Sequence, residues 1–363
     1  MEGLRDLRNP DLVRRLAEQL RQMAAPPATL MEVCGTHTVA IARHGLREAL
    51  PEGVRLISGP GCPVCVTPQD QIDLFIALGG LDGVRLATFG DMVRVPGTEK
   101  SLEQARAEGA EVLVVYSPMD AVEAAARDPE KQVAFFGIGF ETTAPGVALA
   151  ILEAERRGLE NFSVLCAHKL IPPAMTALLE SEVAIDGFIC PGHVSTIIGS
   201  NAYRPIAERG KACVVAGFEA ADVLRSVHML LRQIGEGRSE VESEYTRAVR
   251  PEGNRKAQEL LARVFRVVDA RWRGLGEIRA SGYELAEGFA GFDAAKRFEV
   301  ERVESVEPAG CRCGDVLRGA IEPPECGLFG KECTPRSPVG ACMVSSEGAC
   351  QAWYRYQGEE RAQ

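Results

Sequence analysis

The strongest constraint on the fold is a regular alternation of short apolar runs with helix-like segments, which begins near residue 28 and fades near residue 237. Such runs, each followed by an amphipathic stretch, are typical of parallel strands buried between helices. The pattern predicts an α/β protein. Eight runs qualify as strands: TLMEVC, VRLIS, VRLATFG, EVLVVYS, QVAFFGIG, FSVLCAH, DGFICPG and KACVVAG. Eight strands would suit two sheets of about four.

Three units are expected along the chain. The polar stretch AAARDPEKQ lies midway along the strand series and is the expected boundary between two α/β domains, 28–128 and 129–236. After about residue 237 the strand signal fades, and VESEYTRAVRPEGNRKAQELLARVFRVV is typical of helices. Residues 237–363, with an N-terminal amphipathic helix within 1–27, would therefore form a third unit.

Composition narrows the function classes. The 363 residues carry a formal net charge of -10, which argues against a protein whose main task is to bind nucleic acid. The opening MEGLRDLRNP is charged where a signal peptide needs an apolar core, and no run of eighteen apolar residues occurs. We therefore expect a cytoplasmic protein without a membrane partner. In that reducing compartment, metal, redox chemistry or burial explains 12 cysteines better than a disulfide framework does.

Four unusual turns follow the predicted strands: CGTHT, GPGCPVC, GFETTAP and PGHVSTIIG. In open α/β sheets, ligands bind beyond the carboxyl ends of strands, where helix N-termini present free N–H groups. In CGTHT, Cys34 should begin a helix with Thr36 or Thr38 as its cap. His37 is close enough to tune the thiol or to share a ligand. Both residues, and His193 in PGHVSTIIG, can equally be packing or capping residues.

GPGCPVC places Cys62 and Cys65 three residues apart on a turn of glycine and proline. Thiols at this spacing lie within disulfide reach when the second half of the motif begins a helix. A helix N-terminus would also lower the thiol pKa and raise the affinity for metal. Three interpretations stay open: a redox disulfide, a pair of metal ligands, or two buried cysteines that fill space.

GFETTAP has the beginning of a glycine-rich phosphate loop, because GxG stands between a strand and a helix. The third glycine of that fingerprint is missing, and Glu141 occupies the place where a pyrophosphate requires positive potential. We therefore reject a dinucleotide site. A tight turn with Thr142 or Thr143 capping the helix, and Pro145 in its first turn, would explain most of the motif.

The other cysteines are of two kinds. Cys166, Cys190 and Cys213 lie in apolar strand candidates and are interpreted as core. Six more crowd into the tail. Four of these have fourteen, six and sixteen residues between successive members: Cys311, Cys326, Cys333 and Cys350.

The tail spacing favours an iron-sulfur cluster over zinc. Zinc ribbons usually have two close cysteine pairs, whereas wide loops with glycine and proline suit thiolates that converge on an iron-sulfur cube. Structural zinc remains the alternative. Cys313 and Cys342 are left over, and spacing alone does not prove which four of the six cysteines are ligands.

The four turns and the tail pattern C-x14-C-x6-C-x16-C, which ends in MVSSEGAC, together resemble the HypD family of nickel-iron hydrogenase maturation proteins. The resemblance runs from about residue 28 to the end of the tail. It implies two similar parallel-sheet, Rossmann-like α/β domains plus a helical, cysteine-rich iron-sulfur domain. It also implies a scaffold on which the hydrogenase iron acquires cyanide and carbon monoxide, as an Fe(CN)2CO unit, before delivery to the hydrogenase large subunit.

The resemblance also implies roles and partners. Cys34 would be an iron ligand, and Cys62 and Cys65 would be a redox dithiol or additional iron ligands. The four spaced tail cysteines would hold a 4Fe-4S cluster. His37, Glu141 and His193 are further site candidates without an assigned role. The implied partners are a HypC-type small chaperone and HypE, the cyanide donor.

Two competing interpretations belong to other classes. A stand-alone, iron-sulfur-linked dithiol-disulfide oxidoreductase would use Cys62 and Cys65 on a diffusible substrate, but Cys34 and His37 would then have no metal to serve. A structural zinc protein would be colourless. The scaffold is the preferred hypothesis, because soft thiolates suit an iron that carries strong-field ligands.

Overall fold

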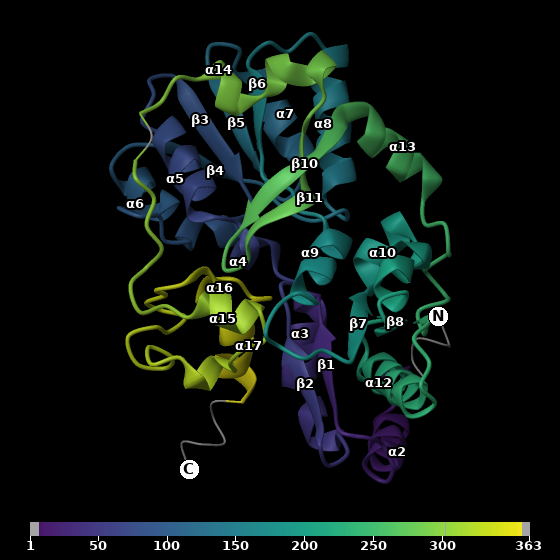
Figure 1. Ribbon diagram of the computed structural model, residues 1–363. Helices are drawn as coiled ribbons and strands as arrows, with labels where there is room; N and C mark the ends of the chain where they lie inside the picture. Colours follow the sequence, from purple (N-terminus) through teal and green to yellow (C-terminus); the bar gives the residue numbers. More distant parts are fainter. Residues whose placement is uncertain (1–6, 302, 358–363) are drawn as a thin grey trace.

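The computed structural model describes residues 7–301 and 303–357 (Figure 1). It is an α/β structure with two parallel sheets, and all eight predicted runs form strands. In sheet order, the five-stranded sheet consists of β2 (Val54–Ser58), β1 (Ala28–Glu32), β7 (Gly187–Pro191), β8 (Ala212–Ala216) and β9 (Val241–Ser243). The four-stranded sheet consists of β4 (Glu111–Val114), β3 (Val84–Thr88), β5 (Gln132–Gly137) and β6 (Phe162–Cys166).

Helices connect the strands and cover the sheets. From the N-terminus to β8 they are α2 (Pro10–Arg21), α3 (Gly35–Arg43), α4 (Pro63–Val66), α5 (Gln69–Leu78), α6 (Leu102–Ala107), α7 (Pro118–Arg127), α8 (Ala144–Arg156), α9 (Ile171–Leu178), α10 (Gly192–Ile198) and α11 (Arg204–Ala207). After β8 they are α12 (Ala220–Gly235), α13 (Arg255–Val264), α14 (Ala294–Arg297), α15 (Cys313–Leu317), α16 (Ala341–Val344) and α17 (Ala349–Tyr356). Five 3₁₀ turns complete the set: η1 (Leu46–Ala49), η2 (Gly90–Arg94), η3 (Ser200–Tyr203), η4 (Glu287–Phe292) and η5 (Pro323–Glu325).

Local sequence explains where several helices begin. Asn9 accepts a hydrogen bond from the Asp11 N–H at the start of α2, and Ser117 with Asp120 forms a capping box at α7. Among the described residues, no helix has both the length and the apolar character needed to cross a bilayer.

The two sheets do not divide at residue 128, the boundary expected from the sequence. β1 pairs with β2 on one side, Leu30 opposite Leu56, and with β7 on the other, Leu30 opposite Gly187. β3 to β6 form the second sheet among themselves. The segment that carries the four-stranded sheet is therefore inserted between β2 and β7, and the two sheets do not correspond to 28–128 and 129–236.

The polar stretch AAARDPEKQ covers the end of α7, the turn that follows it and the first residue of β5. Hydrogen bonds attach this turn to the four-stranded sheet. Nδ2 of the buried Asn161 donates to the main-chain oxygens of Ala125, Asp128 and Lys131 at 2.9, 3.2 and 2.9 Å. Nη2 of Arg85 pairs with Asp128 at 3.1 Å. The polar turn therefore takes part in local hydrogen bonds and an ion pair. A sequence pattern cannot distinguish such a turn from an interdomain linker.

The prediction of helices through residue 268 was wrong in part. α13 ends at Val264, and the chain continues as an antiparallel hairpin of β10 (Phe265–Trp272) and β11 (Gly276–Leu285). β10 is rich in aromatic and β-branched residues, which favour a strand. The hairpin covers the loop after β6, since Leu170 N donates to Ser281 O at 2.8 Å and Tyr283 N donates to His168 O at 3.2 Å.

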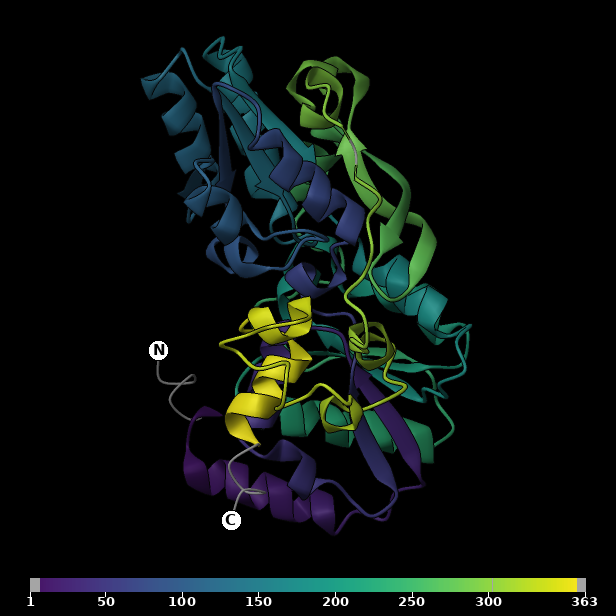
Figure 2. The same cartoon turned by 90° about the vertical axis from the view of Figure 1, so that its left-hand side faces the viewer.

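The cysteine-rich tail packs against both neighbouring parts of the fold. Its short helices α15, α16 and α17 are joined by loops, and they lie beside α3 and below α4 in Figure 1. α16 contacts α4, and α17 contacts α3. Figure 2 shows the same helices against the five-stranded unit. The tail is thus held next to the segments that follow β1 and β2.

The Asn161 contacts give a test of the turn's role. Asn161→Ala should destabilise the protein by about 2 kcal/mol, because one buried and two partly buried carbonyls lose their donor. Thermal unfolding of the full chain measures the change. Glu160→Ala, on the neighbouring exposed residue, should stay within about 0.5 kcal/mol of wild type. Equal effects of the two substitutions would contradict the assigned role.

Candidate functional site

Cys34 stands where β1 ends and α3 begins, as the sequence predicted. Its backbone is extended, at the N-cap position, and its side chain is buried. Neither threonine caps the helix as expected: Thr36 Oγ1 donates to Glu347 Oε1 at 2.7 Å, and Thr38 Oγ1 donates to Glu32 Oε1 at 2.6 Å. Both hydroxyls instead hold carboxylates close to Cys34.

The CGTHT and GPGCPVC turns touch through their backbones. Gly35 N donates to Gly61 O at 2.9 Å, and a Cβ added at Gly61 would overlap the main chain of Cys34. Cys62 and Cys65 form a disulfide, with Cα atoms 5.3 Å apart, and Cys62 stands at the N-cap of α4. Both cysteines are buried. The structure therefore brings Cys34 and the cysteine pair to one place.

Glu32 is a functional candidate that the sequence reasoning missed. It ends β1, is fully buried, and accepts a hydrogen bond from Cys34 N at 3.0 Å. Burial raises the pKa of the Glu32 carboxyl to about 7, against the opposing effect of its hydrogen bonds. The available signal was an acidic residue at the end of an otherwise apolar strand.

The Cys34 thiol is protonated in this form of the protein. Burial raises its pKa to about 12, and the negative charges of Glu347 and Glu32 act in the same direction. The N–H groups of His37 and Thr36 oppose this shift. The sequence argument expected the helix N-terminus to favour the thiolate; here desolvation is the larger effect.

His37 and His193 both stack on one aromatic ring, that of Phe218. His37 is buried and stacks on Phe218 at 4.9 Å, and His193 stacks on Phe218 at 3.9 Å between centroids. His37 Nε2 donates to Gly217 O at 2.9 Å, and its Nδ1 has no hydrogen-bond partner among the described residues. Burial lowers the His37 pKa to about 4, so the ring is neutral. A neutral imidazole can serve as a metal ligand.

Glu141 lies in the GFETTAP turn, and its carboxyl is buried. Its Oε1 accepts a hydrogen bond from Ile171 N at 3.1 Å, and burial raises its pKa to about 7. Thr143 is the N-cap of α8 but makes no side-chain cap; its Oγ1 donates to Ile138 O at 3.2 Å. Gly139 has φ 137, which only glycine adopts readily. GFETTAP is thus a tight turn with a buried carboxyl.

All six tail cysteines line one cavity, together with Leu328, Phe329 and Met343. Cys313 and Cys342, the two left over by spacing, touch each other with sulfurs 2.7 Å apart. No three His, Cys, Asp or Glu side chains of residues 7–301 and 303–357 converge on a single ion position. The six thiols therefore surround one small, largely apolar cavity.

Glu347, between the last two tail cysteines, reaches the Cys34 turn. A Cβ added at Gly35 would overlap Glu347, so the tail backbone lies directly on the start of α3. Arg273, at the tip of the β10–β11 hairpin, is buried and donates to Thr67 O and Gln69 Oε1, both at 3.0 Å. The tail and the hairpin therefore enclose the segment around α4.

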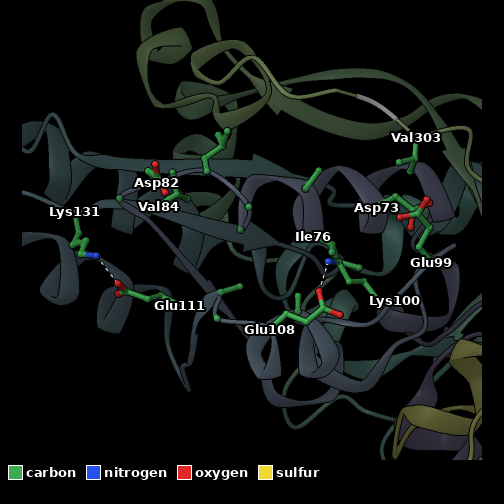
Figure 3. Close-up of a pocket in the computed structure, with 18 residues that line it drawn as sticks. Asp73, Ile76, Asp82, Val84, Glu99, Lys100, Glu108, Glu111, Lys131 and Val303 are labelled. Carbon is green, nitrogen blue, oxygen red and sulfur yellow. Dashed lines mark hydrogen bonds and ion pairs between the residues drawn. The ribbon is translucent and has the colours of Figure 1, made fainter.

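A wide cavity of about 500 Å³ lies elsewhere, at the amino ends of β3 and β4 (Figure 3). Figure 3 shows Lys100 facing Glu108 and Lys131 facing Glu111, and both are ion pairs. Ligand sites of parallel sheets lie at the opposite, carboxyl ends. This cavity has paired charges and none of the predicted site residues in its lining.

Comparison with known proteins agrees with the geometry. The family described as "HypD: Hydrogenase formation hypA family" matches residues 11–357. Hydrogenase maturation factor HypD of Azotobacter vinelandii is 48% identical over 100% of this chain and 98% of its own length. The HypD of Rhodobacter capsulatus is 48% identical over 97% of this chain and 95% of its own. The chain therefore belongs to the HypD family of hydrogenase maturation factors.

Proposed function

We propose that this chain is a cytoplasmic assembly scaffold with redox activity, on which an Fe(CN)2CO unit is built together with a HypC-type chaperone and HypE. The iron and its diatomic ligands are cargo, destined for the hydrogenase large subunit. The observation that carries the proposal is the junction of the two turns, where Cys34 meets the Cys62–Cys65 pair. One thiol and one imidazole form an incomplete ligand set, which suits a scaffold that must release its product.

The charges around Cys34 disfavour a free thiolate and would favour a thiolate that is bound to a metal ion. Glu347 and Glu32 both raise the pKa of the Cys34 thiol. The same carboxylates would attract a dication at the sulfur. Iron binding would therefore displace the thiol proton, and the free site would keep its thiol protonated and unreactive.

We further propose that Cys311, Cys326, Cys333 and Cys350 hold a 4Fe-4S cluster. The shared cavity supports this assignment, and the spacing of these four cysteines in the tail favours them among the six. When bound, such a cluster would supply single electrons. α16, which carries Cys342, packs against α4, and the disulfide of Cys62 with Cys65 would accept two electrons and two protons to become two thiols.

The disulfide also raises the alternative of a stand-alone dithiol-disulfide oxidoreductase. Exchange with a diffusible partner requires access to one of the two sulfurs. Cys62 is 3% exposed and Cys65 is 0% exposed. An intramolecular role is therefore favoured.

Cys34 is predicted to be the indispensable ligand to the assembled iron. Cys34→Ala should abolish the infrared bands of iron-bound cyanide and carbon monoxide in the complex purified with the HypC-type partner. Cys34→Ser should be nearly as damaging, because a hard oxygen replaces a soft sulfur. Cys213→Ala, which removes another buried thiol, should keep the bands. If Cys34→Ala kept the bands at wild-type intensity, the iron site would be assigned to Cys62 and Cys65 instead.

The cluster assignment predicts about four irons per chain in anaerobically purified protein, with cluster-type absorption. Alanine at any of the four proposed ligands should release the cluster and loosen the tail. Cys342→Ala should retain it. Substoichiometric iron with one tightly held zinc ion would contradict the assignment.

The disulfide is predicted to respond to the cluster. Acid-quenched thiol trapping should show Cys62 and Cys65 reduced together when dithionite is added to the wild type. In Cys326→Ala the reduction should no longer follow the redox state of the cluster, which this variant lacks, and should depend only on the access of bulk reductant to the disulfide. If both thiols stay alkylatable under every oxidising condition in which the protein remains folded, a ligand or packing role replaces the switch.

A further inference from the structure

A second cavity of about 370 Å³ lies between α5, the carboxyl end of β6 and the β10–β11 hairpin. Its volume is that of a small-ligand site, and it stands at the end of a parallel strand where such sites form. Cys166, Lys169 and Gln71 are among its lining residues. Cys166, predicted to lie in the core, is partly exposed, whereas Cys190 and Cys213 are buried as predicted.

Lys169 is a buried cation without an anion. It is 2% exposed, and its hydrogen bond goes to Gln71 Oε1 at 3.4 Å. No carboxylate of the residues that the structure describes lies within ion-pair distance of its Nζ. Asp70, which acts on it from further away, pairs with Arg271 at 3.5 Å. A buried ammonium without a counter-ion is costly.

The groups next to Lys169 are neutral. His168 is buried, with its Nδ1 3.3 Å from the sulfur of Cys166, and burial lowers its pKa to about 3. The Cys166 thiol donates to Tyr283 O at 3.2 Å, and burial raises its pKa to about 12. Neither group supplies the missing negative charge.

Six carboxylates line the cavity, and all but Glu301 have a partner among the described residues; Asp70 pairs with Arg271, and Thr98 Oγ1 donates to Asp73. Glu284 pairs with Arg266, and Asp293 pairs with Lys296. Asp269 accepts the Ala280 N–H at 2.8 Å. These carboxylates would repel any anion, a dianion more strongly than a monoanion, so the Lys169 ammonium at short range offsets the repulsion of one negative charge more readily than that of two. The rest of the wall includes apolar side chains, Leu74, Ala270 and Ala295 among them.

We propose that this cavity binds a small aliphatic monocarboxylate, with Lys169 as its counter-ion and Gln71 as a hydrogen-bonding neighbour. The carboxylate replaces the anion that the fold does not provide, and the short chain lies against the apolar wall. None of the cysteines or histidines assigned to the assembly site lines this cavity.

The test uses the full-length protein and propionate as the probe, with saturation-transfer NMR and thermal shift at constant ionic strength. Propionate should bind saturably and raise the unfolding temperature. Propionamide, which has the same shape without the charge, should bind at least about tenfold more weakly. Sulfate should not compete. These wild-type measurements need no variant: absence of saturable propionate binding, or equal binding of propionamide or sulfate, overturns the proposal.

Variants then locate the site. Lys169→Met keeps the length of the side chain and removes the charge, and it should weaken propionate binding at least about tenfold. Lys131→Met removes a cation that is paired with Glu111 and should bind propionate as the wild type does. Circular dichroism checks that both variants fold. Wild-type affinity in folded Lys169→Met would exclude Lys169 as the counter-ion.

Discussion

The site depends on one close approach between two backbones. β1 and β2 are parallel neighbours in register, so their carboxyl ends reach the same edge of the sheet. There Gly35 N donates to Gly61 O, and the space beside Cys34 admits no side chain at Gly61. Because Pro63 begins α4 directly afterwards, the disulfide is held against the start of α3. A glycine and one hydrogen bond thus bring the Cys34 turn and the Cys62–Cys65 disulfide together.

Two carboxyl groups lie beside Cys34 at this place: Glu32 is buried and Glu347 is partly exposed. Glu32 is tied to the turn by Cys34 N and Thr38, and Glu347 is tied to it by Thr36. Desolvation alone would keep Cys34 protonated, and the two carboxylates reinforce that state. A cation beside the sulfur would reverse the sign of their effect on the thiol, and this is the electrostatic basis of the iron site proposed above.

Much of this could be predicted from the sequence, because the decisive signals are local. Each apolar run of the eight became a strand, and Cys34 and Cys62 occupy the helix starts that their turns predicted. Strand partnership is not local: nothing in the pattern of β1 states that it pairs with both β2 and β7. Glu347 was missed for the same reason, since its contact with Thr36 joins residues 311 positions apart.

The tail is part of the site rather than an appended module. Ser346 N donates to Asp91 Oδ2 at 3.2 Å, beside the four-stranded sheet, while the adjacent Glu347 holds Thr36 beside the five-stranded one. This short stretch lies between Cys342 and Cys350, so it links both sheet units through residues next to the cysteine cavity. The loop that carries Glu347, whose charge raises the pKa of Cys34, is therefore anchored beside the cysteine cavity. In the proposed assembly role, this loop would connect the cluster ligands to the iron ligand through direct contacts.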